Sequence, residues 1–289
     1  MRAPVRAAVG AALGDRVTDT RPLSGGDIND AYRVTLASGR AVFVKTNDGA
    51  HPRMFPCEAR GLSWLAEAAS VRVPDVLAVT DERADGPHFL VLELIEAGAP
   101  ARDFGERLGR GLAGVHVAGA DFFGLAHDNF IATLEQANGR ADSWPEFYAQ
   151  RRLLPLARMA VERGLAPTSW RGRFAALTER MTDVCGPVEP PARLHGDLWH
   201  GNVHHSDRGP VLIDPAVYGG PREVDLAMLA LFGGVDHEFL AGYQAEWPLQ
   251  PGFEARLPLW QLYPLLVHVV LFGGGYVGAV DQALADLGA

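Results

Sequence analysis

The chain has 289 residues, which is enough for one large domain or for two lobes that share a cleft. Hydrophobic residues make up 48% and charged residues 21%, proportions that supply a full core and are ordinary for a globular protein. Acidic residues outnumber basic ones, 35 to 26, and no run of Lys or Arg stands out, so the composition argues against a nucleic-acid partner. The net charge of -9 suits a cationic substrate, although solubility is the simpler explanation.

Cysteine content and apolar stretches bear on where the protein works. Two cysteines without a CxxC spacing argue against a disulfide framework and a structural zinc site, and fit a reducing cytoplasm. The N-terminal stretch MRAPVRAAVGAALGD favours a surface helix over a signal peptide, because its apolar core is short. The most apolar stretch, residues 262–280, is interrupted by Pro264, His268 and consecutive glycines. We therefore expect a buried helix that ends at Gly273, no membrane span and a cytoplasmic location.

Strand patterns dominate the first part of the chain. Residues 32–47 predict two β-strands joined by a turn at residues 37–40. Residues 56–70 predict a helix, because their apolar side chains fall on one helical face. Residues 74–98 predict a second hairpin, turning at Asp85-Gly86-Pro87. These patterns together indicate an antiparallel sheet with an inserted helix.

Helical patterns dominate the rest of the chain. Residues 104–119, 144–164 and 170–186 have helical spacing, and most of the sequence after Val224 does too. We expect a two-lobed α+β fold, with a small, antiparallel, β-rich N-lobe followed by a larger, mainly helical C-lobe. The predicted boundaries are residues 1–94 and residues 95–289. Clefts between such lobes commonly hold small-molecule sites.

The N-lobe contains two features suited to binding phosphate. Ser24, Gly25 and Gly26 precede a strand, and glycines let backbone N–H groups approach phosphate oxygens, although a simple turn explains them as well. Lys45 ends an apolar strand and is either a solvated edge residue or a cleft residue that holds phosphates. Glu58, on the inward side of the next helix, is its candidate ion-pair partner.

The stretch LHGDLWHGN, followed by LIDPA, concentrates polar groups between apolar segments. Mg²⁺ prefers oxygen ligands and keeps several waters, so Asn202 and Asp214 suffice as its protein ligands. Asp197 is then free to orient an attacking hydroxyl group and accept its proton. Each residue alone is ordinary in a turn, but the three together favour a site for phosphoryl transfer.

The glycine-rich turn, Lys45, Glu58, HGDLWHGN and IDPA together resemble the aminoglycoside phosphotransferase and protein-kinase-like superfamily. The spacing from Asp197 to Asn202 matches that of the kinase catalytic loop. Gly196 stands in place of the arginine of that loop, and Pro-Ala stands in place of Phe-Gly after the metal-binding aspartate. Both departures point toward small-molecule kinases rather than protein kinases.

Over nearly its whole length the sequence is similar to the fructosamine kinase (ketosamine-3-kinase) family. The segments that carry this resemblance are DNFIATLEQANG, LHGDLWHGN, IDPAVYGGPREVDLAM and LYPLLVHVVLFGGGY. The resemblance implies a protein-kinase-like fold and ATP- and Mg²⁺-dependent phosphorylation of the sugar 3-hydroxyl of ketosamines. The partner would be a small-molecule ketosamine or a glycated amine, and the reaction would be a deglycation step.

The resemblance also implies roles for individual residues. Asp197 is the expected catalytic base, and Asn202 and Asp214 are the expected Mg²⁺ ligands. Lys45 would hold the α- and β-phosphates with Glu58 as its partner. The remaining nucleotide contacts would come from Ser24, Gly25 and Gly26 over the phosphates, and from the backbone of Glu93 and Ile95 at the adenine edge.

Substrate contacts are less sharply indicated. Trp199 could carry a sugar on its aromatic face or could pack between the lobes. Arg222 and Glu223 could contact the substrate or brace the catalytic loop, and bracing is the preferred interpretation. We expect His195 to shape that loop, and Asp225 to anchor its backbone.

Three alternative functions remain open. One is a kinase of the same superfamily that acts on an aminoglycoside, choline or homoserine. Another is a nucleotide-binding scaffold without catalysis, although such scaffolds usually lose residues that this chain retains. The third is a protein kinase, which the short segment between DPAVYGG and REVDLAM disfavours. The preferred sugar and the oligomeric state cannot be predicted from the sequence.

Overall fold

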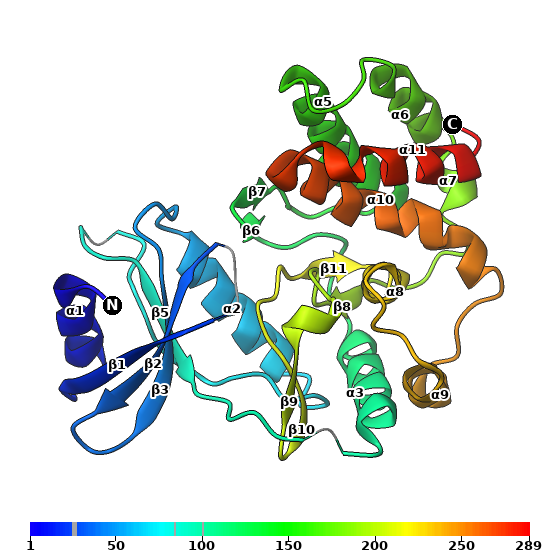
Figure 1. Cartoon of the computed structure of the whole chain (residues 1–289). Coiled ribbons are helices and arrows are strands. Elements are labelled where there is room, and N and C mark those ends of the chain that lie inside the picture. Colours follow the sequence, from blue (N-terminus) through cyan, green and yellow to red (C-terminus); the bar gives the residue numbers. More distant parts are fainter. Residues whose placement is uncertain (25–27, 84, 100) are drawn as a thin grey trace.

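The structure is a computed structural model of the whole chain, and it describes residues 1–24, 28–83, 85–99 and 101–289. A small β-rich lobe stands beside a larger helical lobe (Figure 1), as the predicted α+β class requires. The N-terminal lobe contains a five-stranded sheet in the order β1-β2-β3-β5-β4. Its strands are β1 (Val17–Leu23), β2 (Asp30–Leu36), β3 (Ala41–Thr46), β4 (Val76–Val79) and β5 (Phe89–Glu93).

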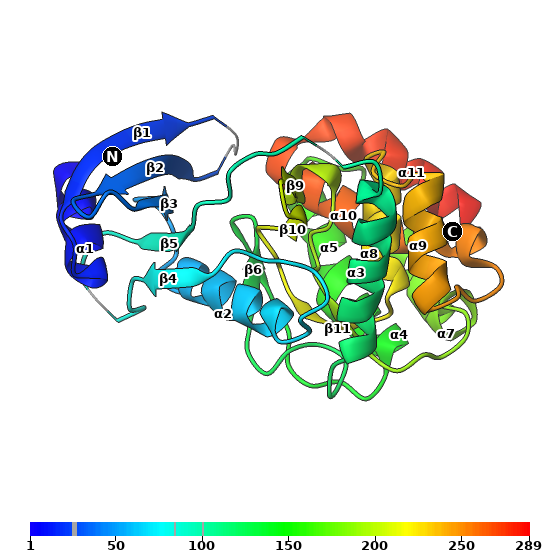
Figure 2. The ribbon, with the colours of Figure 1, turned by 90° about the horizontal axis from the view of Figure 1, so that it is seen from below.

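All neighbouring strands of this sheet are antiparallel, and both predicted hairpins are present. The turn between β2 and β3 contains Gly39 with φ at 86°, a conformation that glycine adopts without steric cost. Helix α1 (Ala3–Leu13) covers the outer face of the sheet. Helix α2 (Met54–Ala66) lies between the opposite face and the C-lobe (Figure 2).

The alternation of β3 determines where its side chains point. Val42 and Val44 pack in the cluster that contains Val5 and Val9 of α1. Their neighbour Phe43 packs with the cluster beneath α2. Because successive side chains of a strand point to opposite faces, Lys45 shares the α2 face of the sheet. The sheet therefore directs this lysine toward the C-lobe.

The C-lobe combines helices with three two-stranded sheets. The sheets pair β6 with β7, β8 with β11 and β9 with β10. Their bounds are β6 (Asn129–Ile131), β7 (Leu134–Gln136), β8 (Ala192–Leu194), β9 (Val203–Ser206), β10 (Gly209–Leu212) and β11 (Tyr218–Gly220). The helices are α3 (Phe104–Ala118), α4 (Trp144–Phe147), α5 (Leu154–Glu162), α6 (Trp170–Glu179), α7 (Met181–Val184), α8 (Glu223–Leu231), α9 (His237–Glu246), α10 (Phe253–Phe272) and α11 (Val277–Asp286).

The helix predicted over residues 144–164 forms with one irregularity. A π-helical segment, Tyr148–Leu153, joins α4 to α5. Short 3-10 turns occur at His200–Asn202 and Gly274–Tyr276. The three small sheets were not predicted, apart from the strand character of the segment that ends before Asp214.

Two pairs of strands bring two loops together. Leu194 at the end of β8 pairs with Tyr218 at the start of β11. Val203 at the start of β9 pairs with Leu212 at the end of β10. The loop of residues 195–202 therefore begins and ends beside the loop of residues 213–217. These two loops carry the polar motifs of the sequence.

One helix among the described residues, α10, has the length and composition of a membrane span. Of its most apolar window, 61% is buried inside the protein. It contacts α5, α8 and α11, and its last residue directly precedes Gly273. This agrees with the buried helix that the sequence predicted.

Candidate active site

The loop after β8 holds Asp197 and Asn202 in direct contact. The Asn202 side-chain amide donates to the backbone carbonyl of Asp197 at 2.8 Å and to its carboxylate oxygen Oδ2 at 3.2 Å. Both bonds use Nδ2, and no described group donates to the amide oxygen Oδ1. That oxygen remains free to serve as a ligand.

Asp225 of α8 holds the same loop by its backbone. Its carboxylate accepts hydrogen bonds from the amides of His195 at 2.7 Å and Gly196 at 2.9 Å. The His195 ring, in turn, bonds the carbonyl of Ile213 at 3.0 Å, which ties the two loops together. Gly196 has φ at 81°, and a Cβ there would lie 2.1 Å from the carbonyl oxygen of Ala216, so only glycine fits. The predicted anchoring roles of Asp225 and His195 are confirmed.

Lys45 joins the two lobes. Its Nζ lies 2.8 Å from Oε1 of Glu58 on α2, so the expected ion pair is present. The same nitrogen lies 2.5 Å from Oδ1 of Asp214 in the loop after β10. Lys45 is 6% exposed, whereas the side chain of Asp214 is 41% exposed. The lysine is thus enclosed, and the aspartate faces open space.

The contact between Lys45 and Asp214 was missed at the level of sequence. The two residues are 169 positions apart, and no local pattern connects them. Asp214 also has φ at 56°, a left-handed conformation that aspartate tolerates better than most residues. This backbone conformation was not predictable from an apolar strand followed by Asp-Pro.

The site carries more negative charge than its lysine neutralises. Burial alone would lower the pKa of Lys45. The negative charges of Asp214 and Glu58 have the larger, opposite effect, so the pKa of Lys45 is raised. Burial, and secondly the charge of Asp214, raises the pKa of Asp197 to about 7. Burial also raises the pKa of Glu58, against the opposing charge of Lys45. A bound cation would relieve this excess of negative charge.

The donor set suits a hard cation. Asn202 and Asp214 offer an amide oxygen and a carboxylate, the ligand types that Mg²⁺ prefers and supplements with waters and phosphate oxygens. Within the described ranges, no group of three or more His, Cys, Asp or Glu side chains could hold a metal ion. The amide and carboxylate oxygens at this site fit the ligand preferences of Mg²⁺.

The remaining predicted nucleotide contacts lie on the N-lobe and the connector. Glu93 ends β5, and its side chain forms an ion pair with Arg72. Among the described residues, the backbone amide and carbonyl of Ile95 have no hydrogen-bond partner. Ser24 is exposed directly after β1. Gly25 and Gly26 lie outside the described residues.

Trp199 lies at the edge of the site, whereas Arg222 and Glu223 lie beneath it. Trp199 is half-buried, and its ring folds over Gly201, where a Cβ would meet it at 2.4 Å. Arg222 is fully buried and forms an ion pair with Glu189 at 2.8 Å. Its burial favours bracing over substrate contact.

Glu223 is fixed in the same way. It is 4% exposed and forms an ion pair with Arg256 at 2.5 Å. It also accepts a hydrogen bond from the indole of Trp260 at 2.9 Å. No substrate contact is therefore proposed for Arg222 or Glu223, which the sequence had left open between two roles.

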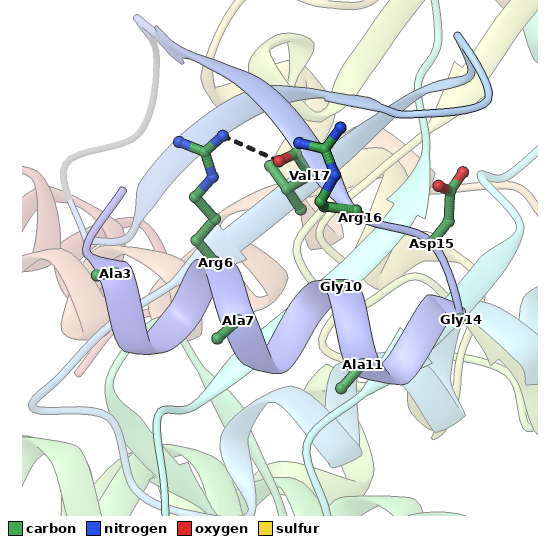
Figure 3. A pocket seen from close by; sticks show the side chains of 9 residues that line it. All are labelled: Ala3, Arg6, Ala7, Gly10, Ala11, Gly14, Asp15, Arg16 and Val17. Atoms are coloured by element: carbon green, nitrogen blue, oxygen red, sulfur yellow. Dashed lines mark hydrogen bonds between the residues drawn. The ribbon is translucent and has the colours of Figure 1, made fainter.

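Away from the catalytic loop, the described residues border at least two hollows. One, of about 600 Å³, follows α1 and the start of β1 on the far side of the N-lobe (Figure 3). Arg6 crosses it to donate to the carbonyl of Val17 at 2.9 Å. The other, of about 430 Å³, lies between the C-terminal end of α2 and the C-lobe, and is bordered by Trp64, Glu67 and Arg193. Neither includes Asp197, Asn202 or Asp214.

Comparison with known proteins gives a consistent result. The family model described as fructosamine kinase matches residues 2–289. A probable ketoamine kinase of Synechocystis sp. is 39% identical over 93% of this chain and 90% of its own length. Another, from Thermus thermophilus, is 41% identical over 91% of this chain and 92% of its own.

Solved structures show the same likeness. A protein of Thermobifida fusca, assigned as a fructosamine-3-kinase, superposes with a TM-score of 0.88 at 41% identity, over 99% of both chains. The choline kinase LicA of Streptococcus pneumoniae superposes with a TM-score of 0.68 at 16% identity, over 98% of this chain and 97% of its own. The second likeness establishes the protein-kinase-like fold alone.

Proposed function

The chain belongs to the fructosamine kinase family, and on that premise we propose that it transfers a phosphoryl group from ATP to the 3-hydroxyl of a ketosamine sugar. The observation that carries this proposal is the convergence of Lys45, Asp197, Asn202 and Asp214 from both lobes. Phosphoryl transfer depends on positioning and charge neutralisation, and these residues provide both. We place the nucleotide-binding lobe at residues 1–94 and the catalytic lobe at residues 95–289.

Asp197 acts as the base in this proposal. Asn202 holds its carboxylate through Oδ2, which leaves the other oxygen for the substrate hydroxyl. The raised pKa of about 7 gives this carboxylate a basicity suited to accepting a proton near neutral pH. Asp197 would orient the 3-hydroxyl group toward the γ-phosphorus and take its proton as the new P–O bond forms.

Lys45 binds the α- and β-phosphates of ATP. Its ion pair with Glu58 fixes the ammonium group, and a phosphate oxygen can replace Asp214 at Nζ. The amide and carbonyl groups of Ile95, which have no partner among the described residues, suit the hydrogen-bonding edge of adenine. The amide of Glu93 already donates to the carbonyl of Asp75 at 2.8 Å, so Glu93 would contribute its carbonyl group. We assign Ser24, Gly25 and Gly26 to the phosphate cover.

Asn202 and Asp214 would hold Mg²⁺, which neutralises phosphate charge during transfer when it is bound. The Asp214 side chain is already partly exposed, so it can bind a cation without a rearrangement of the loop that carries it. Phosphorylated ketosamines are unstable, and we therefore propose that the reaction removes sugars from glycated amines. The substrate is a small-molecule ketosamine or a glycated amine.

ATP consumption by the purified protein tests this function. The panel contains fructosyl-, ribulosyl- and erythrulosyl-lysine, an aminoglycoside, choline and homoserine, each with Mg²⁺. We expect turnover with ketosamines only, and its loss in Asp197→Asn. Asp142→Asn is the matched control, because the Asp142 side chain is 90% exposed. Turnover on another alcohol would overturn the substrate assignment. ATP binding without any turnover would favour a non-catalytic nucleotide-binding protein.

A further inference from the structure

A row of aromatic side chains runs from the catalytic loop to the end of α10. It comprises Trp199, Phe232, His268, Phe272 and Tyr276, and we call it the aromatic row. Ring centroids are 6.1 Å apart for Trp199 and Phe232, 5.0 Å for Phe232 and His268, and 4.8 Å for His268 and Tyr276. The row begins two residues after Asp197 and is separate from the metal ligands and from Lys45.

This row is open to solvent, unlike the aromatic core of the C-lobe. Phe272 is 55% exposed, and the other members are half-buried. By contrast, Trp144 and Tyr148 of the core are 3% and 0% exposed. The backbone beside the row is also open, because a Cβ added at Gly273, Gly274 or Gly275 would meet nothing within 4 Å. Aromatic faces therefore border accessible space next to the catalytic loop.

His268 has a defined tautomer. Its Nδ1 lies 2.7 Å from the carbonyl oxygen of Pro264, which can only accept, so Nδ1 carries the hydrogen. Burial lowers the pKa of His268, against the effect of that hydrogen bond, so the ring is neutral at pH 7. Its Nε2 is then an acceptor, and no described residue donates to it.

We propose that the aromatic row binds the protonated amine of the ketosamine, with His268 Nε2 accepting its N–H and the rings of Phe232 and Tyr276 facing its charge. The inference rests on the proposed function. In a ketosamine the nitrogen is attached at C1, two carbons from C3. When the 3-hydroxyl group is at Asp197, the amine therefore lies only a few bonds from that carboxylate, and the aromatic row begins two residues away, at Trp199. Aromatic faces attract such cations, and a neutral imidazole supplies the acceptor that they lack.

The competing explanation is that the row only packs α10 against the end of α8. Packing alone would affect stability and would change the kinetics of all substrates equally. Recognition of a charged amine instead predicts discrimination between a cation and a neutral isostere. The nature of the atom at C1 therefore separates the two explanations.

The test compares two substrates that differ at that atom. One is 1-butylamino-1-deoxyfructose, whose nitrogen is protonated; the other is 1-O-butylfructose, in which a neutral ether oxygen replaces it. For the natural chain we expect kcat/KM to be about tenfold or more higher with the amine. In His268→Phe the ratio should fall to about twofold, through a higher KM for the amine and little change for the ether. His268→Gln, which restores an acceptor, should recover part of the ratio.

His237→Phe is the matched control, because His237 is exposed at the start of α9. If His268→Phe fails to fold, Tyr276→Leu, in the turn after α10, is the substitute. It should also lower the ratio of kcat/KM between the amine and the ether, but by less. A natural ratio near one, or a ratio that survives these variants, would overturn the role of the row. Absence of turnover with both sugars and with fructosyl-lysine would instead overturn the proposed function itself.

Discussion

Two polar centres flank the catalytic loop, and both use carboxylates with a basic partner, but for different purposes. Around Asp225, the carboxylate accepts from the amides of His195 and Gly196 and lies 3.2 Å from Nε2 of His116. The other ring nitrogen of His116 lies 2.7 Å from the hydroxyl group of Tyr243. Asp225 is 1% exposed and His116 is fully buried. This centre is closed, and its hydrogen bonds hold the catalytic loop.

The centre around Lys45 is instead open and unbalanced. One ammonium group lies between Glu58 and Asp214, with Asp197 as a third carboxylate nearby. The pKa values of Glu58 and Asp197 are both raised, chiefly by burial. A carboxylate whose charge is disfavoured in the folded state costs stability, and binding a cation removes that cost. The comparison shows that satisfied polar groups maintain the fold, whereas unbalanced ones bind ligands.

Substituting Asp225 by Ala should produce the largest loss of stability. It removes the acceptor of two buried backbone amides and of His116, which leaves these donors unsatisfied. We expect the free energy of unfolding to fall by about 3–5 kcal/mol, together with loss of activity. Urea denaturation monitored by circular dichroism measures it. Asp142→Ala, at an exposed site, should change stability by less than about 0.5 kcal/mol.

Asp197→Asn should show that the centre around Lys45 serves catalysis and not folding, because the substitution should remove activity without lowering stability. Loss of the base should lower kcat by about 10²–10³-fold while leaving the affinity for ATP unchanged. In the same variant the melting temperature should rise, since the neutral amide avoids the cost of a buried charge. A destabilised Asp197→Asn protein would contradict the distinction between an open and a closed centre.

The gain in stability of Asp197→Asn should depend on pH. The pKa of Asp197 in the folded protein is about 7, above its ordinary value of 3.8, so the folded state favours the protonated form. This contribution to stability is present below pH 4 and is lost as the pH rises to about 7. Asn carries no charge at any pH, so the advantage of the variant should grow over that interval and then level off. Thermal unfolding in EDTA between pH 4 and pH 8 measures it, with an expected plateau of up to about 4 kcal/mol.

Asp214→Asn should have a smaller effect, confined to ligand binding. Saturating ADP with Mg²⁺ should stabilise the natural chain by about 2–3 kcal/mol at a hundredfold excess over the Kd. In Asp214→Asn at least half of this stabilisation by ADP and Mg²⁺ should disappear, because a carboxylate ligand of the metal is lost. The ligand-free variant should melt no earlier than the natural chain, since the excess of negative charge is reduced. An unchanged ligand-induced shift would remove Asp214 from the metal site.

The sequence predicted the parts of this site that local chemistry specifies. Asp197, Asn202 and Asp214 stand in short motifs, and the alternation of β3 correctly placed Lys45 on the inner face of the sheet. The second contact of Lys45 and the left-handed backbone of Asp214 depend on tertiary structure and have no local signal. The sheets β6–β7, β8–β11 and β9–β10 were not predicted either, because strands of three or four residues are too short to show alternation. Helix α10 was predictable because its apolar run is long and ends at glycine.

Arg193 provides the smallest and most specific test, because it connects the two centres. It lies on β8, two residues before His195, and its guanidinium group is 4.6 Å from the ring of Trp64 on α2. It donates to the carbonyl of Trp64 at the end of α2 and to that of Gly119, at 3.3 Å, at the end of α3. The strand that leads into the catalytic loop is thus fixed to the helix that carries Glu58.

Replacing Arg193 by Gln should loosen α2 without touching any reacting group. We expect the KM for ATP to rise about threefold to tenfold, since Glu58 would hold Lys45 less firmly, with a smaller change in kcat. Steady-state kinetics at varied ATP measure this, with Arg171→Gln at an exposed site of α6 as the control. The KM for the sugar should stay constant, because Arg193 contacts Trp64, Glu67 and Gly119, none of which belongs to the aromatic row. Equal increases in both KM values would mean that Arg193 supports the C-lobe as a whole and does not couple the closed centre to the open one.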